Sequence, residues 1–416
     1  MPRVAKEEQP SLKRVIGLPG AVMLGLGSII GTGVFVSLAI GADIADAMVL
    51  PAIALAGLVA LCNGLSSAQL AANHPVSGGT YEYGHRWLNP SLGFVAGWMF
   101  LCAKSASAAT AALGFALYVM PEQTLPMALG LTVVITGLSL TGLQRSNAVN
   151  TIIVALVLLS LAAFVATGAP ALAQHSERFE PLFDSQRLSD LLQAAALMFV
   201  AYTGYGRIAT MGEEVREPRR IIPRAMILTL TATLILYLAV AAVALGNAGS
   251  EFDSLANIAQ AFSGSTLANA LTAGAAFAMV SVLLNLVLGL SRVVLAMGRR
   301  GDLPEATANI RESTGVPVTA TLVVGAFIAG LVCIGDFKLT WSFSAFTVLV
   351  YYALTNLCAI RLKPEERLYP VWISYIGLIA CLSLAFFVEW RVMLIGLGLI
   401  AAGLFWKAAF NRAAHG

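Results

Sequence analysis

The sequence predicts an all-α polytopic membrane protein with twelve transmembrane helices. Hydrophobic residues make up 58% of its 416 residues and charged residues 11%, whereas a soluble domain has about 25% charged residues. The polar gaps between apolar runs, at most about 20 residues long, leave no room for a soluble domain. The first apolar run is too long for the core of a signal peptide. We therefore expect a single membrane domain over residues 1–410.

Each predicted span is an apolar run long enough to cross the hydrocarbon core of a bilayer. In the first half of the chain, the runs cover residues 17–40, 48–72, 90–119, 125–143, 147–169 and 189–212. In the second half, they cover residues 222–246, 266–297, 317–335, 339–361, 369–388 and 391–410. The runs 90–119 and 266–297 exceed the bilayer thickness, so we expect these helices to tilt or to extend beyond it.

The basic residues predict the orientation of the spans. With twelve spans, alternate loops share one side of the membrane, and 18 of the 25 Lys and Arg residues then lie on the side of the N-terminus. Three lie in or near spans, and the other side holds four, namely Arg178, Arg187, Lys338 and Arg391. Because cytoplasmic loops are rich in Lys and Arg, we expect both termini in the cytoplasm. Losing or adding one span would scramble this asymmetry, which supports the count.

Two spans are interrupted by glycine-rich segments at matching places. The first segment reads Gly27-Ser28-Ile29-Ile30-Gly31-Thr32-Gly33, and the second, in the sixth span, reads Ala201-Tyr202-Thr203-Gly204-Tyr205-Gly206. Glycine weakens a helix and lets its backbone unwind. Unwound backbone at membrane depth is tolerated only where it lines a cavity or is buried in protein. Paired interruptions of this kind indicate the substrate site of a transporter, so we expect the chain to carry a small molecule across a membrane.

Two cations lie at the depth of a span centre, whereas none of the 22 acidic residues does. Lys104 lies in the third span, and Arg207 directly follows the second glycine-rich segment. An unpaired cation there is costly, so each needs a water-filled cavity, backbone carbonyls or an anionic ligand. The five cysteines and four histidines show no metal-ligand spacing. We therefore expect no metal site.

Four motifs resemble those of amino acid permeases in the amino acid–polyamine–organocation (APC) superfamily. The segment from Gly27 to Phe35 resembles G-x-I-I-G-[ST]-G-[IV]-F, and the segment from Pro75 to Tyr81 resembles P-x-[ST]-G-G-x-Y. Residues 213–225 resemble E-E-[VM]-x-x-P-x-R-x-[IL]-P-x-A. Residues 291–304 are similar to [ST]-R-x-x-x-A-M-[AS]-R-D-G-x-x-P. The motifs occur in the family's order, and the resemblance extends from about residue 10 to 410.

The resemblance implies a LeuT-like fold. Two inverted repeats of five spans would cover residues 15–169 and 188–361 approximately, and two additional spans would cover about 369–410. In this fold, the first and sixth spans are unwound at the membrane midplane, and alternating access exposes the site to one side at a time. The positions of the glycine-rich segments agree with this expectation.

An α-amino acid needs donors for its carboxylate and acceptors for its ammonium group. At the first break, the candidate donors are the amides of Gly31, Thr32 and Gly33 and the Thr32 hydroxyl, because a helix N-terminus attracts anions. The candidate acceptors are the carbonyls of Ile29, Val200 and Thr203, and the resemblance places Val200 at a gate above the substrate. The other candidate substrate-binding residues are Ile30, Ala201, Tyr202, Gly204 and Tyr205.

Competing interpretations are structural. Gly31 and Gly33 would serve close helix packing, and Tyr202 and Tyr205 would be packing aromatics. The segment Ser77-Gly78-Gly79 is interpreted as a cytoplasmic turn. Glu213 and Glu214 are interpreted as part of a solvated loop, with a gating salt bridge as the alternative. The mid-span Asn63, Asn285 and Asn356 are interpreted as interhelical hydrogen-bonding groups.

The coupling mechanism stays open. Related permeases often carry a lysine in the fifth span, where this chain has Val157. Lys104 or Arg207 could supply that charge, Ser291 and first-span carbonyls near Ser28 could bind sodium, or transport could be uncoupled exchange or facilitated flow. Arg207 could instead neutralise carbonyls at the cut ends of the sixth helix, or bind the side chain of an acidic substrate. We expect no cofactor beyond a coupling ion, H⁺ or Na⁺.

The expected function is secondary-active transport or exchange of an amino acid by alternating access in the bacterial inner membrane, with neutral L-amino acids first. The alternatives are an antiporter of acidic amino acids, amines or polyamines, and a membrane receptor that binds an amino acid without moving it. An enzyme is not expected, because the chain has no nucleophile elbow and no H-E-x-x-H. The expected partners are the substrate and the lipid bilayer, but no nucleic acid; a homodimer or a small accessory membrane subunit is an open alternative.

Overall fold

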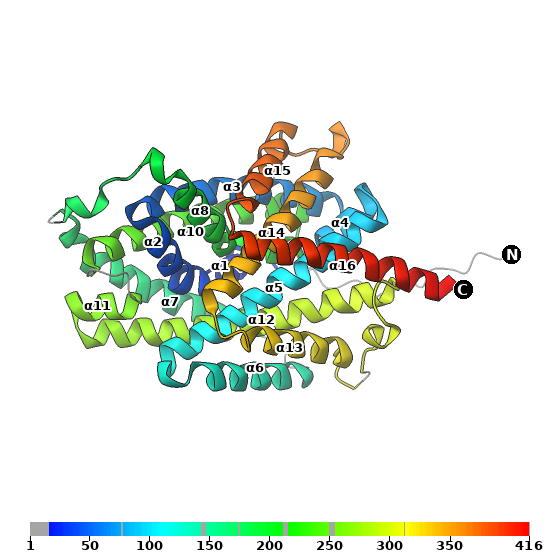
Figure 1. The fold of residues 1–416 in the computed structure, drawn as a ribbon, viewed down its shortest axis with the longest axis horizontal. Helices are drawn as coiled ribbons and strands as arrows, with labels where there is room; N and C mark the ends of the chain where they lie inside the picture. Colours follow the sequence, from blue (N-terminus) through cyan, green and yellow to red (C-terminus); the bar gives the residue numbers. More distant parts are fainter. Residues whose placement is uncertain are drawn as a thin grey trace.

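The computed structural model is a bundle of helices (Figure 1). It describes residues 16–75, 78–142, 147–173, 175–210, 215–248, 254–311 and 313–415. Within these residues there is no β-strand, and two isolated bridges join Ile16 to Val215 and Arg311 to Val316. The helices are α1 (Leu18–Ile29), α2 (Leu38–Ala45), α3 (Val49–Asn73), α4 (Thr80–Trp87), α5 (Pro90–Val119), α6 (Thr124–Leu140), α7 (Asn147–Gly168), α8 (Leu188–Tyr202), α9 (Gly206–Thr210), α10 (Pro218–Asn247), α11 (Leu255–Ser263), α12 (Ser265–Arg299), α13 (Val318–Val332), α14 (Phe337–Ile360), α15 (Val371–Ala385) and α16 (Trp390–His415).

Shorter helical turns connect or extend these helices. One is a π-helix, η1 (Gly33–Ser37), and the others are 3₁₀ turns: η2 (Asp46–Met48), η3 (Pro121–Gln123), η4 (Ala169–Ala173), η5 (Ser176–Phe179), η6 (Ser185–Arg187), η7 (Thr203–Tyr205), η8 (Glu305–Ala308) and η9 (Pro364–Glu366). Side-chain caps fix several helix starts, because the first N–H groups of a helix lack intrahelical partners. Asn89 accepts from the Leu92 N–H at α5, and Asp336 accepts from the Leu339 N–H at α14.

Each of the twelve predicted spans coincides with a helix, or with two helices on either side of a break. By length and composition, eight helical stretches of the described chain can cross a membrane, and one of them, Leu18–Asn73, covers the first two predicted spans. The apolar helices α13 and α15 are shorter than these. The number of twelve spans therefore stays a prediction. Two helices, α4 and α11, lie between predicted spans.

The centre of the bundle is formed by α5 and α14, which pack against each other. In their most apolar 18-residue windows, 83% and 78% of the residues are buried, whereas the corresponding figure for α16 is 17%. Figure 1 shows α6, α12 and α13 together along one side, and these three helices contact one another. An apolar helix with so little buried surface must face lipid, so α16 lies at the periphery and α5 in the core.

Candidate functional site

The first predicted break is present within the first span. α1 ends at Ile29, and Ile30 has extended backbone with φ −78° and ψ 110°. The chain returns to helical conformation at Thr32, with φ −54° and ψ −30°, and continues through η1 into α2. The amides at the start of this second helical segment are the groups expected to lack intrahelical acceptors. Thr32 is buried, and among the described residues its hydroxyl has no hydrogen-bond partner.

The break in the sixth span is milder than full unwinding. α8 ends at Tyr202, three residues form the 3₁₀ turn η7, and α9 begins at Gly206. Thr203 has φ −70° and ψ 0°, and Gly206 has φ −54° and ψ −24°, so the backbone stays in the right-handed region. A 3₁₀ turn is tighter than the α-helix. The sequence predicted an unwound segment here, and the structure instead has a local tightening that still interrupts the α-helix.

The two breaks lie directly against each other. A Cβ atom added to Gly204 would lie 2.3 Å from the carbonyl oxygen of Ser28. A Cβ atom added to Gly33 would lie 3.1 Å from both the Cβ atom and the carbonyl oxygen of Ala201. Only glycine permits backbones to approach this closely. Glycines at both breaks thus serve the contact between the first and sixth spans, and Gly31 similarly faces Val282 of α12.

All three carbonyls predicted as ammonium acceptors already accept hydrogen bonds from hydroxyl groups. The Tyr237 hydroxyl lies 3.2 Å from the Ile29 oxygen, and the Thr203 hydroxyl donates to the Val200 oxygen at 2.7 Å. The Tyr352 hydroxyl donates to the Thr203 oxygen at 3.3 Å. Tyr237 and Tyr352 are not among the site residues predicted from the sequence. Each is a polar group within an otherwise apolar span, which is the signal that could have found them.

Lys104 reaches the second break from the centre of the bundle. It is 8% exposed, and its Nζ donates to the Thr203 hydroxyl oxygen at 2.7 Å. Among the described residues, no carboxylate lies within ion-pair distance of this ammonium group. The structure therefore brings together Lys104 from α5 and the 3₁₀ turn of the sixth span.

The other candidate coupling residues are more dispersed. A Cβ atom added to Gly289 of α12 would lie 3.5 Å from Nη1 of Arg207, so this guanidinium extends toward α12. The Ser28 hydroxyl donates to the Leu24 carbonyl at 2.9 Å, and the Ser291 hydroxyl donates to the Leu288 carbonyl at 3.1 Å. Both serine hydroxyls thus donate within their own helices rather than to each other.

The two candidate tyrosines of the sixth span are fully buried. The Tyr202 hydroxyl donates to the Ile53 carbonyl at 3.2 Å, and its ring lies 5.2 Å from the ring of Tyr237. The Tyr205 ring lies 5.3 Å from that of Tyr352. These contacts form an aromatic layer around the breaks, which agrees with the packing interpretation.

Ion pairs close the bundle on the side that the charge distribution predicts to be extracytoplasmic. Arg187, before α8, pairs with Asp46 at 2.8 Å and also donates to the Ile44 carbonyl. Hydrogen bonds to Asp46 and Asp190 raise the pKa of Arg187. Lys338 at the start of α14 pairs with Asp43 at 2.7 Å. The chain directly after the first span is thus tied to the starts of the sixth and tenth spans.

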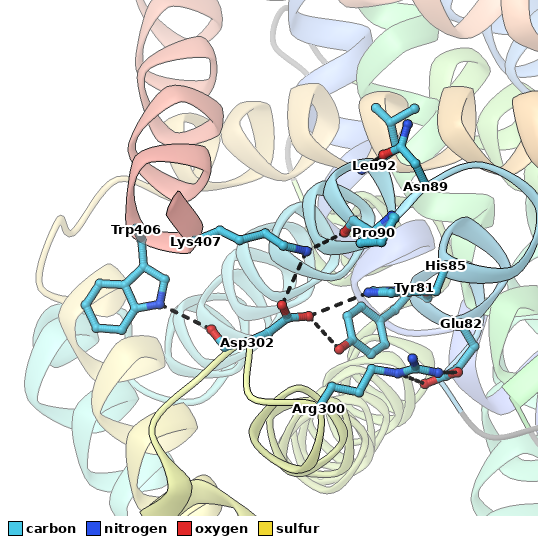
Figure 2. A network of polar contacts seen from close by, with 10 residues as sticks. All are labelled: Tyr81, Glu82, His85, Asn89, Pro90, Leu92, Arg300, Asp302, Trp406 and Lys407. Carbon is cyan, nitrogen blue, oxygen red and sulfur yellow. Dashed lines mark hydrogen bonds and ion pairs between the residues drawn. The ribbon is translucent and has the colours of Figure 1, made fainter. Parts of the chain in front are cut away.

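A polar network on the opposite side joins two of the sequence motifs (Figure 2). The buried Asp302 carboxylate accepts from the Tyr81 hydroxyl at 2.7 Å and lies 3.3 Å from Nζ of Lys407 and 3.7 Å from Nε2 of His85. Burial and the hydrogen bond to Asp302 raise the pKa of Tyr81. Arg300 pairs with Glu82 through two hydrogen bonds. The network clamps α4 and α16 to the loop after α12.

Two further predictions concern residues away from the breaks, namely a pair of asparagines and a glycine turn. Asn356 of α14 donates to the Asn63 side chain of α3, which confirms the interhelical interpretation for this pair. Gly78 and Gly79 have positive φ angles of 124° and 57°, as a turn before α4 requires. Ser77, Glu213 and Glu214 lie outside the described residues.

An apolar bundle in which two broken helices meet at glycines is typical of a membrane transporter. Residues 20–411 match the family model of amino acid permeases. An uncharacterized transporter of Mycobacterium tuberculosis is 40% identical over 94% of this chain and 90% of its own length. The branched-chain amino acid permease BcaP of Bacillus subtilis is 29% identical, over 78% and 76%. The cationic amino acid transporter 7 of Arabidopsis thaliana is 23% identical, over 94% and 73%.

The chain belongs to the amino acid permease family of the APC superfamily. It is a multi-pass integral membrane protein and a transporter, not an enzyme.

Proposed function

We propose that the chain transports or exchanges an L-amino acid by alternating access, and that neutral amino acids are its favoured candidate substrates. The observation that carries the proposal is the contact between the two breaks, where the amides of Gly31–Gly33 begin a new helical segment shortly after the Ile29 carbonyl. Donors and acceptors at one place fit an amino acid's carboxylate and ammonium groups. The named relatives include a branched-chain amino acid permease, which favours an apolar side chain.

An acidic amino acid is the second candidate substrate. It is favoured by Lys104, a buried cation at the second break with no carboxylate partner among the described residues. A side-chain carboxylate would complete an ion pair there, in a place where an isolated charge is costly. The absence of acidic residues from span centres argues against a cationic substrate or a polyamine.

Lys104 is also our proposed coupling residue. If the substrate is neutral, the lysine can hold a proton in one state of the cycle and release it in another, and its hydrogen bond to Thr203 links that proton to the second break. Arg207, beside Gly289, is assigned a structural role at the cut end of the sixth helix. Ser28 and Ser291 remain the alternative, a sodium site.

The fold, membrane and orientation that we propose are those expected for this family. Spans one to five and six to ten form two inverted repeats, followed by two additional spans, in a bacterial inner membrane with both termini cytoplasmic. A homodimer or an accessory subunit is compatible with this arrangement.

The test is a counter-flow screen with purified protein in liposomes. Liposomes loaded with a mixture of unlabelled amino acids receive each radiolabelled amino acid in turn, with and without proton and sodium gradients. Accumulation selective for neutral amino acids supports the first candidate, and accumulation of aspartate and glutamate supports the second. Folded protein that accumulates no labelled amino acid under any of these gradients refutes the proposal.

A further inference from the structure

Tyr237 of α10 connects the two breaks through a single hydroxyl group. The residue is 1% exposed, and its hydroxyl oxygen lies 3.2 Å from the carbonyl oxygen of Ile29 and 3.2 Å from that of Ala201. Ile29 is the last residue of α1, and Ala201 lies in the last turn of α8. One side chain from a third helix therefore lies between carbonyls of both broken spans.

The Tyr237 hydroxyl cannot donate to both carbonyls at once. A phenolic hydroxyl has one proton and can donate to only one of the two carbonyls. An ammonium group has three donors and forms charge-assisted bonds that are stronger than neutral ones. Two buried carbonyls that share a neutral donor are therefore better suited to an ammonium group.

The hydroxyl also occupies space beside the first break. A Cβ atom added to Gly33 would lie 2.1 Å from the Tyr237 hydroxyl oxygen, closer than any real contact. The tyrosine thus fills the position that the missing side chain of Gly33 leaves open. Gly33 has no Cβ atom, and the substrate's carboxylate is expected to approach the backbone amides at this place. The substrate and the hydroxyl compete for this space as well as for the carbonyls.

We propose that the Tyr237 hydroxyl is a built-in competitor of the substrate's ammonium group. It holds the Ile29 and Ala201 carbonyls until an amino acid binds, and it leaves them when the ammonium group takes its place. Tyr237 is then a positioning residue that sets affinity and keeps the two breaks together between transport events. The inference rests on the proposed function, since it requires an amino acid at the breaks.

Removing a competitor tightens binding. In Tyr237→Phe, the ring remains and the hydroxyl is lost, so the ammonium group no longer displaces a hydrogen bond. We expect the dissociation constant to fall about two- to tenfold, which is the contribution of one neutral hydrogen bond. If the hydroxyl were instead a ligand of the substrate, the same variant would bind more weakly.

The experiment measures binding of tritiated L-leucine to the purified full-length protein, or of whichever amino acid the counter-flow screen identifies. The matched control is Tyr118→Phe, which removes another hydroxyl that donates to a first-span carbonyl, that of Phe35, also at 3.2 Å. Tighter binding by Tyr237→Phe but not by Tyr118→Phe supports the proposal. Unchanged or weaker binding by Tyr237→Phe overturns it.

A second measurement does not depend on that variant folding. A single 3-fluorotyrosine at position 237 reports its surroundings by ¹⁹F NMR. We expect its resonance to move as the amino acid is added, with the same midpoint as binding, and an unmoved resonance in protein that binds the amino acid overturns the inference alone. Wild-type protein that binds no amino acid overturns the proposed function and this inference with it.

Discussion

Gly204→Ala is the substitution that most directly tests whether contact between the breaks underlies function. The added Cβ atom would lie 2.3 Å from the carbonyl oxygen and 2.4 Å from the carbonyl carbon of Ser28. Both are backbone atoms, which cannot rotate away as the end of a flexible side chain can. Relieving the overlap therefore requires η7 to move away from the end of α1.

Overpacking of this kind costs about 1–3 kcal/mol. If the substitution mainly destabilises the conformation in which the two breaks are in contact, amino acid affinity falls about 5- to 150-fold. We expect a lower unfolding temperature in detergent together with weaker binding of the counter-flow substrate. The matched control is Gly137→Ala in α6, where an added Cβ atom has nothing within 4 Å. Because alanine favours a helix over glycine by up to about 1 kcal/mol, the control should be slightly more stable and bind normally.

Two results would refute the reasoning. If Gly204→Ala were as stable as Gly137→Ala and bound the substrate normally, the close contact with Ser28 would not exist in the working protein. If it lost stability but kept the wild-type affinity, the contact would support the fold without shaping the substrate site.

Three other substitutions test two candidate site residues and the polar network around Asp302. Thr32→Val keeps the shape of the side chain but removes a candidate donor to the substrate carboxylate, so we expect the affinity for transported substrate to fall about tenfold, the contribution of a hydrogen bond to a charged group, with folding intact. Unchanged transport kinetics would exclude the hydroxyl from this role. Lys104→Met should abolish proton-driven accumulation while counter-flow continues, because a protonatable group at Thr203 is lost; accumulation that still follows the proton gradient in liposomes would contradict coupling through this residue. Asp302→Asn removes the charge facing Lys407 and His85, and we expect a lower unfolding temperature with unchanged amino acid affinity; equal melting curves would mean that the network contributes nothing to stability.

Hydropathy predicted much of the fold. The twelve apolar runs coincide with helices because a bilayer demands long apolar segments whose backbone is internally satisfied. The glycine-rich segments located both breaks, since glycine at Gly33 and Gly204 is what lets the backbones meet. Periodicity could not predict the 3₁₀ form of the second break, because all its residues accept right-handed helical backbone and the contact with Ser28 joins segments far apart in the sequence.

The partners of the site were harder to predict than its position. Tyr237 lies 36 positions from Ala201, and Lys104 lies 99 positions from Thr203. Their contacts with the second break therefore depend on how the helices pack. A single polar group in an apolar span indicates a buried role, but not which carbonyl it meets. Asp302 shows the same limit, because its hydrogen-bond partner Tyr81 lies 221 positions away, in another sequence motif.

The π-helix that follows the first break has a consequence for the ion pairs of Asp43 and Asp46. One extra residue inserted into a regular α-helix would turn everything after it by about 100°. A π turn instead takes up the extra residue within one wider turn, so η1 lengthens the segment after the break while α2 keeps its orientation. Asp43 in α2 and Asp46 just after it thus stay directed toward Lys338 and Arg187.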